Sequence, residues 1–331
     1  MIEAERWKLL RYDLPLHRPL TTGGGLRRQG LLLTVHRGTH TGYGEAAPIP
    51  GFHPDSLDVV AAQLTRTLRD GIAPTAAVAR FCIESAALSL AAAEQATRPA
   101  ALLTTTPAPD APINALIDDA NPGARARVLV AEGCGAVKIK VGRRGLDHEI
   151  QAIRAVSLAA PGLRIRLDAN RAWTLDKACR FCDALSGVRI DYLEEPLRDP
   201  ALLSDFYART GVGIGLDESL SEGHGGFPDG TAALVIKPTV VGGIEVALGL
   251  SARAQELGAQ AVISATFETS VGLGMLCEVA CATRPDPPPQ GLGTGRWLAG
   301  DVCEPLEVVG SRLSWRPVIL NMDGLVEVSS G

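Results

Sequence analysis

The sequence predicts an α/β protein built on a TIM-like (β/α)7β barrel, with an N-terminal α+β capping domain that the C-terminal tail completes. Seven short apolar runs are spaced like the strands of βα units, and they begin at residues 113, 136, 164, 190, 213, 233 and 261. Helical patterns that end near Gly or Pro fill the gaps between them. Five successive runs end in a charged residue, which is how barrel strands deliver side chains to a catalytic face.

An open, doubly wound sheet is the alternative fold. It would have to accommodate seven consecutive βα units, whereas a closed barrel aims all the charged tips at one mouth, so the barrel is favoured. The eighth unit should lie near residues 290–298, where a preceding Pro-rich run makes the pattern weaker. We expect the capping domain at 1–110, the barrel at 111–302, and a C-terminal segment at 303–331 that returns to the capping domain.

The first 110 residues have a different pattern. Residues 1–50 alternate polar and apolar side chains, with turns rich in Gly and Thr, which predicts a small antiparallel sheet. Two helices are predicted at 56–70 and 74–95, and the second is so rich in Ala that it should pack closely on its neighbours. The Pro-rich segment 97–112 is expected to lead out of this domain.

The stretch 21–30, TTGGGLRRQG, is expected to form a mobile Gly-rich loop in the capping domain. One interpretation is a solvated hairpin tip. The other is a lid that folds over an anionic ligand, with Arg27 or Arg28 meeting a carboxylate.

Composition and charge exclude several kinds of partner. The formal net charge is -5 and the 32 Lys and Arg residues are scattered, so no basic field for nucleic acid is expected. No apolar stretch has the length of a membrane span, and the N-terminus lacks the features of a signal peptide, which favours a cytoplasmic location. A small-molecule partner is expected, and the oligomeric state stays open. Cys179 and Cys182 form a CxxC within a helical pattern, and we interpret them as packing residues.

Asp168, Glu194 and Asp217 end three consecutive apolar runs, so a barrel would bring their carboxylates together. Like charges about 4 Å apart at an effective dielectric near 20 repel by about 4 kcal/mol per pair, so three acids require a cation among them. Oxygen ligands without His or thiolate favour a hard ion, Mg2+ first and Mn2+ second. The alternative is three acidic strand ends that solvate a rim or pair with lysines.

Lys138 and Lys140 precede the acidic runs, and Lys237 follows them. The i, i+2 relation puts the first two on one strand face, here the barrel interior. Burial and neighbouring cations disfavour an ammonium ion, so a neutral amine becomes available as a base near pH 7. A metal with an amine on each side suits removal of a proton from the carbon next to a carboxylate. Ion pairing with the acids is the alternative role for the lysines.

Several motifs resemble the enolase superfamily, in the muconate-lactonizing-type subgroup that carries Lys on both sides of the metal. They are KIKVG, LDANRAW, YLEEPL, LDESL and VIKPTVVGGI. Within the superfamily the chain is most similar to the o-succinylbenzoate synthase family. The likeness extends to GYGEAAPIPGF in the capping domain and to ISATFETSVGL late in the barrel.

This resemblance implies a role for each matching residue. The three acids would bind the metal. Lys140 would act as acid and base, Lys237 would stabilise the intermediate as a cation, and Lys138 would assist. Substrate contacts are implied for Asn170, Ser264, Thr266 and Ser270, and the 21–30 loop would cover the succinyl tail.

The implied reaction is a syn elimination of water from 2-succinyl-6-hydroxy-2,4-cyclohexadiene-1-carboxylate through a metal-stabilised ene-diolate. It gives 2-succinylbenzoate for menaquinone or phylloquinone biosynthesis. One alternative is an N-succinylamino acid racemase or dipeptide epimerase that uses the same lysines and metal. A non-catalytic, anion-binding barrel is the other, and it predicts that at least one of the charged groups is missing, whereas none is.

Overall fold

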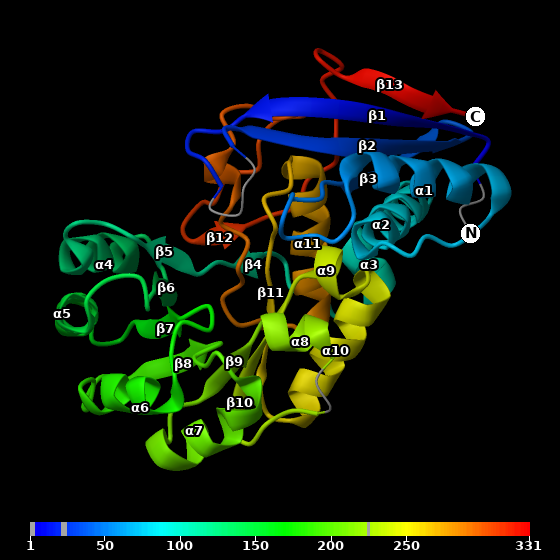
Figure 1. Cartoon of the computed structure of the whole chain (residues 1–331). Coiled ribbons are helices and arrows are strands. Elements are labelled where there is room, and N and C mark those ends of the chain that lie inside the picture. The colour runs from blue at the N-terminus through cyan, green and yellow to red at the C-terminus, as the bar shows by residue number, and fades with distance from the viewer. Residues whose placement is uncertain (1–3, 21–24, 224–225) are drawn as a thin grey trace.

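The computed structural model describes residues 4–20, 25–223 and 226–331, and it has the predicted fold (Figure 1). An antiparallel sheet with helices lies beside a parallel sheet that curls into a barrel. Within these ranges, no helix has the length and apolar character needed to cross a membrane.

The N-terminal body is a four-stranded antiparallel sheet with two helices packed on it. The strands run in the order β13-β1-β2-β3, and their bounds are β1 Arg6–Pro15, β2 Arg27–Arg37, β3 His40–Ala46 and β13 Val326–Ser330. Helix α1 spans Leu57–Asp70 and is capped by Ser56. Helix α2 spans Ala77–Glu94 and packs tightly on β3, because a Cβ at Gly44 would lie 2.0 Å from the Cys82 carbonyl oxygen.

The C-terminal strand β13 pairs with β1, so the last segment of the chain returns to the N-terminal sheet (Figure 1). Strand β2 begins at Arg27 and pairs with β1 from that residue onward. The predicted loop 21–30 is therefore too long, since residues 27–30 are strand. Residues 21–24, the centre of the predicted lid, lie outside the described ranges.

The barrel sheet contains seven parallel strands in chain order, each overlapping a predicted apolar run. They are β5 Ala115–Ile117, β6 Ala136–Lys140, β7 Arg164–Asp168, β8 Ile190–Glu194, β9 Ile214–Leu216, β10 Thr231–Ile236 and β11 Gln260–Ile263. The helices between and after them are α4 Pro122–Ala131, α5 Leu146–Ala159, α6 Leu175–Asp183, α7 Leu203–Thr210, α8 Glu218–Glu222, α9 Pro238–Val241, α10 Ile244–Glu256 and α11 Ser270–Thr283.

Residues 290–291 join the two edges of this sheet. Gly291 forms a parallel bridge with Ser264 just beyond β11, and Gln290 forms one with Ile113 just before β5. An irregular segment thus fills the eighth position of the barrel, where the sequence pattern was weak. The remaining short elements are α3 Pro99–Leu103, β4 Ala111–Pro112, the 3-10 helices η1 Pro200–Leu202 and η2 Gly295–Trp297, and β12 Arg312–Leu313.

A fully buried arginine crosses the barrel interior two residues below the tip of β7. The Arg166 guanidinium donates to four acceptors from different parts of the ring: Asp191 Oδ2 at 2.9 Å, Asn114 Oδ1 at 2.9 Å, Gln260 Oε1 at 2.8 Å and the Pro289 carbonyl at 2.6 Å. These acceptors belong to β8, to β11 and to the segments on either side of the closing bridges. One side chain therefore ties the ring together.

Arg166→Met should destabilise the protein, because it removes the cation beside the Asp191 carboxylate and the donor of three other acceptors. Removing one member of a buried ion pair costs about 3–5 kcal/mol. Urea unfolding followed by circular dichroism measures the loss. The control is Arg253→Met, which removes an exposed pair with Glu256 and should change the free energy of unfolding little. Equal stability of the two variants would contradict the role of Arg166.

Candidate active site

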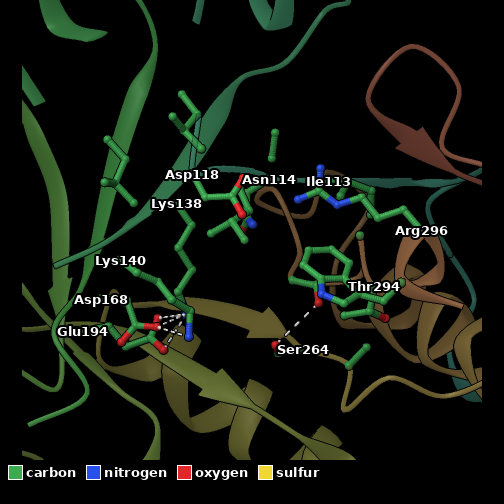
Figure 2. Close-up of a pocket in the computed structure, with 18 of the residues that line it drawn as sticks. Ile113, Asn114, Asp118, Lys138, Lys140, Asp168, Glu194, Ser264, Thr294 and Arg296 are labelled. Carbon is green, nitrogen blue, oxygen red and sulfur yellow. Dashed lines mark hydrogen bonds and ion pairs between the residues drawn. The ribbon is translucent and has the colours of Figure 1, made fainter. Parts of the chain in front are cut away.

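Three charged side chains stand in register at the C-terminal ends of β6, β7 and β8: Lys140, Asp168 and Glu194. Lys138 lies two residues earlier on β6 and therefore projects from the same face of the strand. Figure 2 shows these four side chains gathered at one place in the barrel mouth. The alternation of the apolar runs predicted this common direction.

Lys138 bridges the two acids of this group. Its Nζ lies 2.7 Å and 2.8 Å from the carboxylate oxygens of Glu194, and 2.9 Å from Asp168 Oδ2. Asp168 is 2% exposed and Glu194 is 1% exposed. An unpaired carboxylate at this depth would be strongly destabilising, so the Lys138 ammonium ion allows both acids to stay in the interior.

The third acid, Asp217, forms an ion pair with a different lysine, Lys237. Asp217 follows β9 and Lys237 follows β10, and Lys237 Nζ lies 2.5 Å from Asp217 Oδ1 and also contacts Oδ2. The centroid of the Phe52 ring, from the N-terminal body, lies 5.3 Å from the same nitrogen, which is a cation–π distance. A carboxylate and an aromatic face therefore hold Lys237 in place.

Lys140 is the least constrained of the three lysines. Its Nζ is 3.8 Å from Asp168 Oδ2 and 3.5 Å from the Asn170 side-chain oxygen. Burial lowers the pKa of Lys140, and the neighbouring Lys138 adds to the shift while Asp168 opposes it. Burial also acts to lower the pKa of Lys138 and Lys237, but the carboxylates beside them outweigh it and raise both pKa values.

The pKa values of the two bridged acids shift in opposite directions. Burial, followed by the Asp168 carboxylate, raises the pKa of Glu194 to about 8, and Lys138 opposes this shift only in part. Burial also acts to raise the pKa of Asp168, but Lys138 and Lys140 lower it overall. A further cation beside these acids would lower the pKa of Glu194.

The donor set at this place fits a hard divalent ion. Asp168, Glu194 and Asp217 offer only carboxylate oxygens, the ligands that Mg2+ and Mn2+ prefer. Among the residues that the structure describes, no three acid, His or Cys side chains already have the arrangement of a metal site. The ammonium groups of Lys138 and Lys237 contact the carboxylates instead.

A buried glutamate that the sequence pattern did not single out fixes the turn after β9. Glu195 Oε1 accepts the backbone amides of Asp217 at 2.9 Å and Ser219 at 2.8 Å, and Oε2 accepts from Arg171 Nε at 3.0 Å. The Glu195 side chain thus holds Asp217 in position through the Asp217 backbone amide. The sequence does contain a signal for this role, the second Glu of LEEP. Consecutive strand residues face opposite sides, so when Glu194 points into the barrel, Glu195 must point the other way.

A cavity of 1190 Å3 opens above these side chains. It is lined by all three acids and all three lysines, and by the predicted substrate contacts Asn170, Ser264 and Thr266. Apolar side chains of the N-terminal body, including Ile49 and Phe52, complete its wall. The cavity therefore lies between the barrel mouth and the N-terminal sheet. A small carboxylate bound there could reach the three acids and three lysines, which we call the charged cluster.

Three other predicted substrate contacts do not line this cavity. Arg27 is exposed and forms an ion pair with Asp13, with Nε and Oδ1 2.8 Å apart. Arg28 is buried and donates to backbone carbonyls on both sides of the domain contact. Ser270 donates to Asp301 Oδ2 at 2.7 Å at the start of α11. Ligand binding by these three side chains stays a prediction. Arg27 already forms an ion pair at the surface, and Arg28 and Ser270 are engaged inside the protein.

Two family models match the chain. Residues 4–97 match "MenC, N-terminal domain" and residues 123–315 match "Enolase C-terminal domain-like". An o-succinylbenzoate synthase of Edwardsiella ictaluri is 33% identical over 301 residues, which cover 86% of this chain and 89% of that protein. A member of the enolase superfamily from Roseovarius nubinhibens, complexed with magnesium, has a TM-score of 0.81 at 21% identity over 98% of both chains. The L-Ala-D/L-Glu epimerase from Bacillus subtilis has a TM-score of 0.78 at 19% identity over 100% of both chains.

Lys138→Met should destabilise the protein, because it removes the cation between two buried carboxylates, and such a loss costs about 3–5 kcal/mol. Burial raises the folded pKa of an unpaired acid above its unfolded value, so the stability of the variant should fall as the pH rises. The deficit should therefore be larger at pH 8 than at pH 5 in urea unfolding. Lys8→Met, which removes an exposed pair with Glu327, is the control. A Lys138 variant as stable as the wild type at pH 8 would refute the bridging role.

Proposed function

This chain belongs to the o-succinylbenzoate synthase family of the enolase superfamily, and we propose that it removes water from 2-succinyl-6-hydroxy-2,4-cyclohexadiene-1-carboxylate to give 2-succinylbenzoate. It is an enzyme, a carbon–oxygen lyase of a metal-dependent family, and the reaction is a step of menaquinone or phylloquinone biosynthesis. The position of Lys140 supports the proposal best. A loosely held amine lines the same cavity as three acids and two firmly held lysines.

Lys140 would carry the proton through both halves of the reaction. The C–H bond next to the ring carboxylate breaks, and the Lys140 amine takes the proton. The C–O bond then breaks, and the same nitrogen returns the proton to the departing hydroxyl, which leaves as water. One residue is sufficient because a syn elimination presents both groups to one face. Its nitrogen is available because the nearest carboxylate oxygen is 3.8 Å away.

Lys138 and Lys237 would act as fixed cations. Negative charge grows on the ring carboxylate as the proton leaves, and positive charge held in place beforehand stabilises it without reorganisation. Lys237 suits this role better than proton transfer, because Asp217 binds its ammonium group and Phe52 covers it.

Asp168, Glu194 and Asp217 would hold the divalent ion, with Mg2+ the first choice and Mn2+ the second. When bound, the ion supplies further positive charge for the carboxylate of the substrate. Glu195 would keep Asp217 in position through its contact with the Asp217 amide. Substrate contacts are proposed for Asn170, Ser264 and Thr266, three further polar side chains of the cavity wall.

Racemisation of N-succinylamino acids, or epimerisation of dipeptides, is the second candidate function. The observation in its favour is that β6 and β10 place an amine on either side of the three acidic strands. That reaction needs Lys237 as a proton donor or acceptor. A wild-type protein that exchanges the α-proton of N-succinyl amino acids in D2O but leaves the cyclohexadiene intact would favour this candidate over dehydration.

Lys140→Ala should lower the kcat of dehydration by a factor of about 10^2–10^4, the usual contribution of a positioned acid or base. The rate is followed by absorbance with freshly prepared cyclohexadiene substrate and Mg2+. Lys177→Ala on α6, away from the cavity wall, is the matched control and should keep wild-type activity. Equal rates for Lys140→Ala and the wild type would remove Lys140 from the mechanism.

Treatment with EDTA should abolish dehydration, because the three carboxylates would lose the cation that they need. Addition of excess Mg2+ should restore the rate, and Mn2+ should also support activity. The measurement is the same absorbance assay after dialysis, with metal content checked by atomic absorption. Full activity in metal-free protein would contradict the metal role of the three acids.

A further inference from the structure

We propose that Arg296 binds the second carboxylate of the substrate, the one at the end of the succinyl side chain, and that Thr294 and Ser264 contact the ketone before it. This inference rests on the proposed function, because the proposed substrate carries two carboxylates. It assigns specificity to residues 290–297, which follow the irregular closure of the barrel.

The charged cluster occupies only one part of the barrel mouth. It comes from β6 through β10, whereas β5, β11 and residues 290–297 contribute none of the three acids and three lysines. The cavity extends into this second part, where its wall includes Asn114, Ser264, Thr294 and Arg296. In Figure 2 Asp168, Glu194 and Lys138 lie at the left of the view, and Thr294 and Arg296 lie at the right. A substrate whose ring carboxylate meets the charged cluster has room for its side chain here.

Arg296 is a cation that is available to a ligand. Its guanidinium carbon lies 4.4 Å from the centroid of the Trp297 ring, and within the described residues it forms no ion pair. Arg18 lies 4.1 Å from the same centroid, but it is paired with Asp118 at 2.9 Å. Stacking on an aromatic ring leaves the N–H donors of a guanidinium free in its plane, and that fork matches the two oxygens of a carboxylate.

Thr294 gives an independent indication of a ligand. Its Oγ1 is buried and has no hydrogen-bond partner among the described residues, although buried hydroxyl groups normally have one. Ser264 Oγ has only a contact of 3.5 Å with the Gly291 carbonyl. Hydroxyl donors beside a guanidinium match a side chain in which a ketone and two methylene groups precede a carboxylate.

The arginines that the sequence suggested for this role are engaged elsewhere. Arg27 pairs with Asp13, and Arg28 donates to backbone carbonyls inside the protein. Arg253 on α10 pairs with Glu256 and does not line the cavity. It carries the same charge and therefore provides a control for a general electrostatic effect.

Isothermal titration calorimetry with Mg2+ should compare 2-succinylbenzoate with 2-butanoylbenzoate, which has the same number of carbon atoms and no terminal carboxylate. The wild type should bind 2-succinylbenzoate roughly tenfold more tightly, as expected for a charge-assisted contact. Arg296→Met should abolish this preference by weakening 2-succinylbenzoate alone. Arg296→Lys should keep part of it, and Arg253→Met should keep all of it.

Two results would overturn the assignment. In the first, Arg296→Met keeps the wild-type preference. In the second, the variant loses affinity for both ligands equally, as a purely structural role would require. The dehydration assay separates this inference from the proposed function. A wild type that dehydrates the cyclohexadiene, with an unchanged preference in Arg296→Met, refutes only the Arg296 contact. A wild type that neither dehydrates it nor binds 2-succinylbenzoate refutes the proposed function itself.

Discussion

The site depends on the balance of three carboxylates that are buried inside one barrel. Asp168 and Glu194 are almost inaccessible to solvent, and Asp217 is only 7% exposed. Acids at this depth persist only beside positive charge, so the barrel must carry its cations at the same level. Lys138 and Lys237 supply this positive charge by direct contact with the carboxylates. Lys140 lies farther from them, with its Nζ 3.8 Å from Asp168 Oδ2. The distinction between two fixed amines and one looser amine follows from this balance.

The sequence predicts those features of the site that follow from the alternation of side chains along a strand. Strand residues alternate between two faces, and parallel neighbours in register share a face, so a charge at the end of each apolar run had to enter the mouth. Asp168 and Glu194 are paired in register for this reason, and the lysines on β6 lie on the same face. The N-terminal alternation indicated the antiparallel sheet by the same logic.

Contacts between distant segments could not be predicted in this way. Arg28 lies on a clear strand, but one of its partners is the Phe267 carbonyl, 239 positions later. The sequence did not indicate the contacts of Arg166 and Glu195. Each stands close in sequence to an acid at a strand end, Asp168 or Glu194, and the pattern of charged strand ends includes only those acids. The closure of the barrel is a bridge of two residues at 290–291, which is too short for any periodic pattern.

The pairing of β13 with β1 has a consequence for biosynthesis. Translation delivers the strand that completes the N-terminal sheet only after every strand of the barrel has been made. During synthesis, one edge of β1 stays uncovered until β13 emerges and pairs with it. An uncovered edge can pair with other chains, so this interval is the one in which the N-terminal sheet is most exposed to aggregation.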